Sequence, residues 1–172
     1  HNNTALGPGA GIQNLGIGAM INITNSTITQ NTSITQGGGG GINNQAGGII
    51  KVLNSIIADN NGNPFQSGSD LVGAFVSLDH NLLTNNAGNT GFTNGVNGDL
   101  VGSSSARIFP RLGLLQNNGG PTMTHALLAN SPAIEAGDPN FNPYAFTPSL
   151  LYHQRGLLFK RVVNGRVDIG AF

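Results

Sequence analysis

Short runs of alternating hydrophobic and polar residues recur along the first half of the chain at a nearly constant interval. Three of them align position by position, at offsets of 29 and 26 residues: 21–31, 50–60 and 76–86. The alternation has the period of a β-strand, in which successive side chains point to opposite faces. A sequence repeat of about 20 to 50 residues is typical of a solenoid, in which each repeat buries its hydrophobic face against the next. The pattern therefore predicts a stack of short parallel strands.

The aligned runs also predict which side chains stack on one another. Two slots contain only Ile, Val or Leu, and each should form a buried column along the axis of the stack. The predicted columns are Ile23, Val52 and Leu78, and Ile28, Ile57 and Leu83.

Two other slots are rich in asparagine, and both lie where the chain must turn between strands. One slot contains Asn25 and Asn54, with His80 in the third repeat. The other contains Asn31, Asn60 and Asn86. Asparagine tolerates the positive φ of tight corners, and stacked carboxamides can hydrogen-bond to one another and to the backbone. We expect a structural role for these residues; a ligand-binding ladder is the alternative.

Two further pairs of segments extend the repeat. Gly11–Asn14 resembles Gly41–Asn44, 30 residues later, and Asp70–Gly73 recurs 29 residues later as Asp99–Gly102. The second pair predicts that Asp70 and Asp99 share a slot. Parallel crossovers are right-handed. We therefore expect an all-β protein, a right-handed, single-stranded parallel β-helix of about six coils. Residues 1–105 would form the repeats, and 106–172 the final coils and an irregular C-terminal cap of the same continuous domain.

Composition limits the function classes. Among 172 residues, 27 are Gly and 24 are Asn, yet 38% are apolar, so the chain has the means to form a core. Only 8% are charged and the net charge is zero, which argues against a nucleic-acid partner. No apolar run is long enough to span a membrane. The chain has no cysteine, which is neutral on compartment. It begins at His1 without an initiator Met, so we interpret it as a C-terminal piece of a longer protein, and the missing leader carries no information.

The second half of the chain resembles a known family. The segments that carry the resemblance are 91–102, 112–128, 131–139, 154–156 and 167–172. Together they are similar to the C-terminal region of bacterial surface proteins with a choice-of-anchor Q domain, which are right-handed β-helix proteins related to polymorphic outer-membrane-protein passengers. The resemblance covers roughly residues 70–172 and implies an extracellular or cell-surface location, with an anchor beyond the chain's end. Two departures stand out, His153 before Gln-Arg-Gly and Arg111 after Pro110, where the family has acidic residues. If those acids bind anything in the relatives, this chain lacks that binding.

Parallel β-helices often carry polysaccharide lyases and glycosidases, whose sites need neighbouring carboxylates. Asp59 and Asp79 belong to different columns, and the slot of Asp70 and Asp99 has no cation beside it in the sequence. We therefore predict no catalytic residues and no cofactor.

A weak calcium candidate is formed by Asp138, Asn140 and Asn142, which place oxygen atoms at alternate positions. An Asx-rich turn before Pro143 is the simpler interpretation, since no closing Glu follows as in an EF-hand loop.

Two expectations concern the C-terminal third. A buried arginine needs a partner, so Arg155 should pair with Asp168 or Glu135. The aromatic residues should plug the open end of the stack; an exposed docking surface is the alternative. The aromatic residues in question are Phe141, Tyr144, Phe146, Tyr152 and Phe159.

The function favoured by the sequence is a non-enzymatic extracellular structural or adhesive module. Its first rival is a fibre subunit that self-associates head to tail, because a stack of strands has unpaired edges at its ends. The second rival is a polysaccharide lyase or glycoside hydrolase. The expected partners are a second copy of the chain at the ends of the stack, or a glycan or other surface component.

Overall fold

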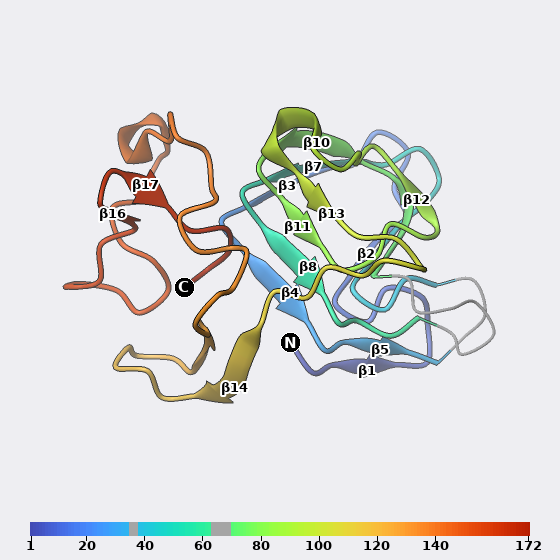
Figure 1. The fold of residues 1–172 in the computed structure, drawn as a ribbon. Helices are drawn as coiled ribbons and strands as arrows, with labels where there is room; N and C mark the ends of the chain where they lie inside the picture. Colours follow the sequence, from blue (N-terminus) through green and yellow to red (C-terminus); the bar gives the residue numbers. More distant parts are fainter. Residues whose placement is uncertain (35–37, 63–69) are drawn as a thin grey trace.

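The structure is a computed structural model that describes residues 1–34, 38–62 and 70–172, and its strands form three parallel sheets that the chain visits in turn (Figure 1). The first sheet contains β2 (Ile12–Asn14), β6 (Ile42–Asn44), β9 (Leu71–Ala74) and β12 (Asn89–Thr90). The second contains β3 (Met20–Thr24), β7 (Ile49–Leu53) and β10 (Val76–Asp79). The third contains β4 (Thr27–Thr29), β8 (Ile56–Ala58), β11 (Leu82–Leu83) and β13 (Leu100–Val101). We call one passage through the sheets a level; levels 1 to 4 begin at β2, β6, β9 and β12.

The strand register follows the sequence repeat through most of the stack. Ile12 pairs with Ile42, and Ile42 pairs in turn with Leu71. The first of these pairs agrees with the repeated Gly-Ile-x-Asn segments. β3 pairs with β7 over five residues and places Ile23 beside Val52. The column of Ile28, Ile57 and Leu83 forms as predicted and continues to Val101. Ahead of level 1, β1 (Thr4–Ala5) pairs in parallel with β5 (Thr32–Ser33), which ends level 1.

The predicted column of Ile23, Val52 and Leu78 is wrong at its third member. Ser77 lies opposite Val52, and the register shifts between Ser77 and Asp79, so Leu78 occupies a bulge and is 47% exposed. A bulge places two residues of one strand opposite one of its partner and turns the next side chain outward. Phe75, one residue before β10, is buried with the core and contacts Phe92 at 5.9 Å between ring centroids.

The stack has four levels in the described part of the chain, not the six expected. The expectation counted the last third as coils, but the two Asp-Leu-Val-Gly segments do not stack on each other. Leu71 pairs with Ile42 in the first sheet, whereas Leu100 pairs with Leu82 in the third. Asp70 and Asp99 therefore lie at different corners, and their 29-residue spacing is a coincidence of loop lengths.

The chain leaves the stack near residue 109 and forms a second part, residues 109–172, which we call the flank lobe. Its strands are antiparallel: β14 (Leu112–Gln116) with β15 (Thr124–Leu127), and β16 (Val162–Val163) with β17 (Arg166–Val167). A 3₁₀ turn covers Pro143–Ala145, and another, at level 4 of the stack, covers Val96–Gly98. Among the described residues, no helix has the length and hydrophobicity that crossing a bilayer requires.

Two separate hydrophobic cores hold the molecule together. The first fills the inside of the stack with side chains such as Ile42, Val52 and Leu83. The second lies on the outer face of the third sheet, where Ile56 and Leu82 meet Ile169 of the flank lobe. The flank lobe therefore lies beside the stack, as Figure 1 shows.

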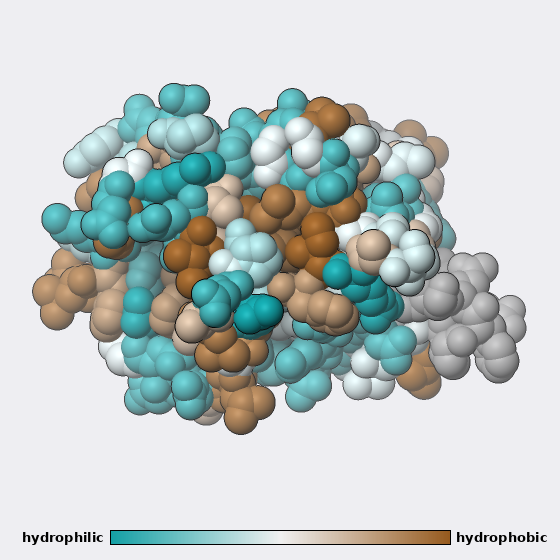
Figure 2. All heavy atoms as spheres, in the orientation of Figure 1, coloured by the Kyte–Doolittle hydropathy of each residue, from teal (hydrophilic) through white to brown (hydrophobic). Residues whose placement is uncertain are grey.

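The prediction that the C-terminal aromatic residues plug the end of the stack is consequently wrong. Phe141 stacks on Phe146 within the flank lobe, and Tyr144 is exposed. On the face drawn in Figure 2, hydrophobic atoms gather over the region where Figure 1 draws β11 and β13, at an end that the flank lobe does not cover. The alternating outward residues of the third sheet, Ile56 and Leu82, are what attract the flank lobe to the side.

Candidate functional site

A ladder of side-chain hydrogen bonds runs along the corner between the third and first sheets. The backbone N–H and the carboxamide N–H of Asn3 both donate to Oδ1 of Asn31, at 3.1 and 2.9 Å. Asn31 donates in the same two ways to Oδ1 of Asn60, at 3.0 and 2.9 Å. Asn60 repeats the pattern on Oδ1 of Asp70, at 2.8 and 3.1 Å. Each link thus satisfies a buried backbone N–H at a corner, which is the structural role predicted for Asn31 and Asn60.

Asn86, the third residue predicted for this slot, is exposed and is not part of the ladder. Asp70 takes its place at level 3, and the buried neighbour Asn85 donates its backbone N–H to the Asp70 carboxylate. In the first two levels, the accepting residue lies at the end of the level. At level 3 it lies at the start of the level, and the prediction failed for this reason.

A second ladder follows the corner between the second and third sheets. Ser26 N–H donates to Oγ of Ser55, and Ser55 N–H donates to Oδ1 of Asn81, at 3.1 and 3.0 Å. Asn81 then donates both its backbone and its carboxamide N–H to Oδ1 of Asp99, at 2.8 and 3.1 Å. This ladder also ends on a buried aspartate.

The corner positions of Asn25, Asn54 and His80 have the positive φ that was predicted for them, 46°, 49° and 43°. The Asn54 carboxamide donates to Oδ1 of Asn25 and, at 3.0 Å, to the backbone carbonyl of Asp168 in the flank lobe. The remaining corner, between the first and second sheets, has a shorter ladder in which Asn14 donates to Oδ1 of Asn44 at 3.1 Å.

The two aspartates that end the ladders are inaccessible, with exposed fractions of 1% for Asp70 and 2% for Asp99. Burial raises the pKa of Asp70 to about 7, although hydrogen bonds from Asn60 and Asn85 favour its charged form. Burial also raises the pKa of Asp99, against hydrogen bonds from Ser77 and Asn81. Both carboxylates lie inside the wall of the stack.

One pocket belongs to the flank lobe and is strongly basic. Its volume is about 230 Å³, and four of the chain's seven Lys and Arg residues line it, together with only two of its seven acids. The charged residues of this basic pocket are Arg155, Lys160, Arg161, Arg166, Glu135 and Asp168. Arg155, Lys160 and Arg161 come from the segment before β16, and Arg166 and Asp168 from the two ends of β17. Glu135 comes from the segment after β15.

Arg155 is held by aromatic rings and neutral acceptors, which contradicts the predicted ion pair with Asp168. Its guanidinium lies 4.0 Å from the ring centroids of both Phe159 and Phe172. It donates to the carbonyl of Asn118 at 3.3 Å and to Nε2 of His153 at 3.1 Å. Nothing in the spacing of Phe159 and Phe172 indicates that they would serve as cation–π partners of Arg155.

His153 lies between the same rings, with its centroid 5.6 Å from that of Phe159 and 5.5 Å from that of Phe172. Burial, assisted by the positive charges of Arg155 and Arg161, lowers the pKa of His153 to about 4. Its imidazole is therefore neutral at pH 7, and Nε2 can accept the hydrogen bond from Arg155. An acid at this position would have neutralised Arg155; histidine leaves the positive charge of the basic pocket intact.

The other cations of the basic pocket also lack acidic partners. Arg161 donates to the carbonyls of Gly170 and Tyr152, both at 3.3 Å, and burial lowers its pKa to about 10. Arg166 donates to the carbonyl of Gly137 at 2.9 Å. Asp168 accepts from the backbone N–H of Glu135 at 2.6 Å. Within residues 1–34, 38–62 and 70–172, none of the four cations has a carboxylate oxygen within 4.0 Å.

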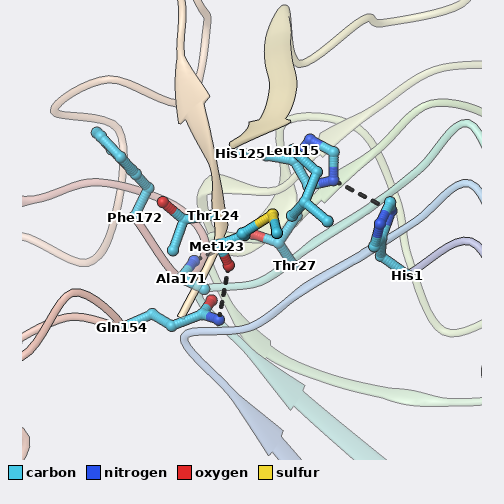
Figure 3. A pocket seen from close by; sticks show the side chains of 9 residues that line it. All are labelled: His1, Thr27, Leu115, Met123, Thr124, His125, Gln154, Ala171 and Phe172. Atoms are coloured by element: carbon cyan, nitrogen blue, oxygen red, sulfur yellow. Dashed lines mark hydrogen bonds between the residues drawn. The ribbon is translucent and has the colours of Figure 1, made fainter. Parts of the chain in front are cut away.

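A second pocket of about 230 Å³ lies between the N-terminus and the flank lobe and is drawn in Figure 3. Nε2 of His125 lies 3.2 Å from Nδ1 of His1, and Nδ1 of His125 lies 2.8 Å from the carbonyl of Gly113. Since a carbonyl can only accept, Nδ1 of His125 donates and Nε2 accepts. Both ring nitrogens of His125 are thus occupied, and the residue has a structural role in this pocket.

The predicted calcium candidates form turns. Oδ1 of Asp138 accepts from the backbone N–H of Asn140 at 2.8 Å, and Oδ1 of Asn142 accepts from that of Tyr144 at 3.0 Å. Asn142 thereby caps the 3₁₀ turn Pro143–Ala145. Both hydrogen bonds are those of the Asx-rich turn that the sequence offered as the alternative.

Sequence reasoning missed the basic pocket, because its cations are spread over 12 residues without a motif. It also missed the second ladder, although Ser26, Ser55 and Asn81 share one slot of the alignment. A search for small polar residues in register would have found that ladder. No family model, curated protein or solved structure matches this chain, so the resemblance to the choice-of-anchor Q proteins stays a prediction.

Proposed function

We propose that this chain is a non-enzymatic extracellular module, a right-handed parallel β-helix with an adhesive role, whose basic pocket binds an anionic group of a surface polysaccharide. The four unneutralised cations of that pocket are the observation that carries the proposal. The coiled architecture is supported by the three parallel sheets and their register.

The chemistry of the basic pocket favours a carboxylate or a sulfate ester as ligand. The guanidinium groups of Arg161 and Arg155 are partly desolvated, and their partners are only neutral carbonyl, imidazole and aromatic groups. In each, Nε has no hydrogen-bond partner. An incoming anion would supply charge-assisted hydrogen bonds that the protein itself does not provide. Uronic acids and sulfated sugars present such groups repeatedly along a chain, which suits weak adhesive contacts.

The test compares polygalacturonate and chondroitin sulfate with neutral dextran in a binding assay at low salt. The double variant Lys160→Gln, Arg166→Gln should weaken binding of the acidic polymers at least fivefold, and binding should fall as salt is added. The matched control is Arg107→Gln, Arg111→Gln, which removes the same charge from exposed positions outside the pocket. Equal loss in the two double variants, or equal binding of dextran, would contradict the proposal.

A fibre subunit is the second candidate, favoured by the first level of the stack. Leu15, Ile17 and Met20 are exposed beside strands whose outer edge is unpaired among the described residues. Such an edge can template pairing with another copy. Light scattering that rises with protein concentration would support this function, and a strictly monomeric protein would exclude it.

A lyase or glycosidase is the least supported candidate. Asp70 and Asp99, the two carboxylates that the sequence placed in one slot, lie at different corners and are buried under hydrogen bonds from asparagine. A polysaccharide cannot reach them, so we propose no catalytic role for either residue.

A further inference from the structure

Outside the basic pocket, a second group of chemically reactive side chains joins the stack to the flank lobe. It consists of Asp79 at the end of β10, His80 at the following corner, and Asp138 of the flank lobe. One ligand atom of each residue lies within 4.8 Å of the corresponding atoms of the other two. All three side chains are partly buried. We propose that these residues bind a divalent transition-metal ion, with Zn²⁺ as the reference, and that the ion fastens the flank lobe to the stack.

The ligand atoms at the centre of this group lack other partners. Oδ1 of Asp79 and Nδ1 of His80 lie 2.5 Å apart. Both atoms are fully buried, and neither makes a hydrogen bond of acceptable geometry. Buried polar atoms without hydrogen bonds are rare. An ion that both atoms coordinate would satisfy them together once they separate to roughly 3 Å, the spacing of two ligands around one tetrahedral Zn²⁺. Asp138 uses Oδ1 for the turn to Asn140, which leaves its other carboxylate oxygen for the ion.

A fully buried neighbour, Asn54, has an unpartnered oxygen beside Gly137, the residue before Asp138. Its Oδ1 has no hydrogen-bond donor, although the residue is 0% exposed. A Cβ on Gly137, the residue before Asp138, would lie only 2.3 Å from that oxygen. The backbone N–H of Asn54 donates to the carbonyl of Asp79 at 2.9 Å, so the two corners are in direct contact. Gly137 thus lets the flank lobe approach closely enough for Asp138 to join the group.

The residue types select the class of ion. His80 occupies the slot that holds asparagine in the first two levels, so this level alone offers an imidazole nitrogen at the corner. On its other edge, the imidazole ring abuts Gly98, where a Cβ would lie 2.4 Å from Nε2, so Nδ1 is the nitrogen that faces the carboxylates. One nitrogen and carboxylate oxygens suit Zn²⁺, whereas Ca²⁺ and Mg²⁺ take oxygen ligands.

The experiment titrates the chelator-treated full chain with ZnCl₂, and separately with CaCl₂ and MgCl₂, by calorimetry and by thermal unfolding. We expect one Zn²⁺ per chain, a higher Tm, and slower proteolysis of the flank lobe; CaCl₂ should have no such effect. His80→Asn inserts the residue that the same corner holds at levels 1 and 2, so the fold should tolerate it. It should weaken Zn²⁺ binding at least tenfold, as should Asp138→Asn.

Asp59→Asn is the control, since Asp59 is an exposed carboxylate at a corner of positive φ and lies outside the group. It should leave Zn²⁺ binding unchanged. Absence of Zn²⁺ binding by the unmodified chain would overturn the proposal. So would Zn²⁺ binding that His80→Asn leaves intact, because Asp79 and His80 would then be an ordinary ion pair. Neither result depends on the basic pocket, so the polysaccharide proposal stands or falls separately.

Discussion

At the residue scale, the corners of the stack are built from one repeated interaction. A side-chain oxygen of one level accepts the backbone N–H and the carboxamide N–H of the level before it, as in Asn31 and Asn60. At a tight corner, a backbone N–H is buried where no neighbouring strand can accept its hydrogen bond, which costs free energy. The side-chain oxygen accepts that hydrogen bond and removes the cost. It also explains why asparagine is so abundant here: it accepts and donates through one short side chain and tolerates positive φ.

Asp70 makes this scale testable through pH. Because burial raises its pKa to about 7 from an ordinary 3.8, the folded protein keeps a proton that the unfolded chain releases. The resulting stability is fully present below about pH 4 and is lost as the pH rises through about 7. Asp70→Asn cannot titrate, so its unfolding free energy should not show this loss. By urea denaturation, wild type should lose on the order of 4 kcal/mol relative to the variant between pH 4 and pH 8. A difference that is constant over this range would refute a buried, titrating Asp70.

At the scale of strands, the sequence predicts the pairing and register best where the repeat is regular. The three sheets, the first two levels of register and the column of Ile28, Ile57 and Leu83 follow from periodicity, because stacking forces equivalent residues together. The offset between paired residues of levels 2 and 3 is 29 at Ile42 and Leu71, 25 at Val52 and Ser77, and 26 at Leu53 and Asp79. The connection between the first and second sheets is therefore shorter at level 3, and the bulge at Leu78 restores one residue. An alignment without gaps cannot show where such a bulge falls, and it therefore placed an exposed residue in the core.

Val52 and Leu78 provide a matched pair for this interpretation. Val52→Asp places an unpaired charge in the core between Ile23 and Ser77 and should destabilise the protein by several kcal/mol, about 3 or more. Leu78→Asp makes the same chemical change at an exposed bulge and should change stability by less than about 1 kcal/mol. Chemical denaturation measures both. Equal costs would mean that Leu78 is in the column after all.

At the scale of the whole molecule, the stack and the flank lobe depend on each other. Ile56 and Leu82 point outward from the third sheet and would face water if the flank lobe were absent. The position of the flank lobe could not be predicted, because residues 109–172 contain no repeat and the outward residues of a strand do not reveal which segment will cover them. The group of Asp79, His80 and Asp138 could not be predicted for the same reason, because its members meet only where the flank lobe docks on the stack.

Ile169 tests this dependence. It is 0% exposed between the stack and the flank lobe, so Ile169→Asp should separate the two parts while the inner core of the stack stays formed. We expect rapid proteolysis within residues 109–172, a melting temperature several degrees lower, and aggregation through the uncovered outer face of the third sheet. Leu158→Asp, at a position of the same lobe that is 86% exposed, should melt and digest like wild type. Similar behaviour of the two variants would place the interface elsewhere.

The ends of the two long ladders have a consequence for how such a chain can grow. Every link donates from an earlier level to a later one, and Asp70 and Asp99 accept without donating onward. Duplication of a unit ahead of these aspartates would lengthen the molecule, since each new asparagine or serine both receives and passes on a bond. In a unit added after Asp99, the side-chain oxygen at that corner would receive no hydrogen bond, because the carboxylate of Asp99 has none to donate. Converting Asp99 to asparagine would be the first step in any attempt to extend this protein by one repeat at its far end.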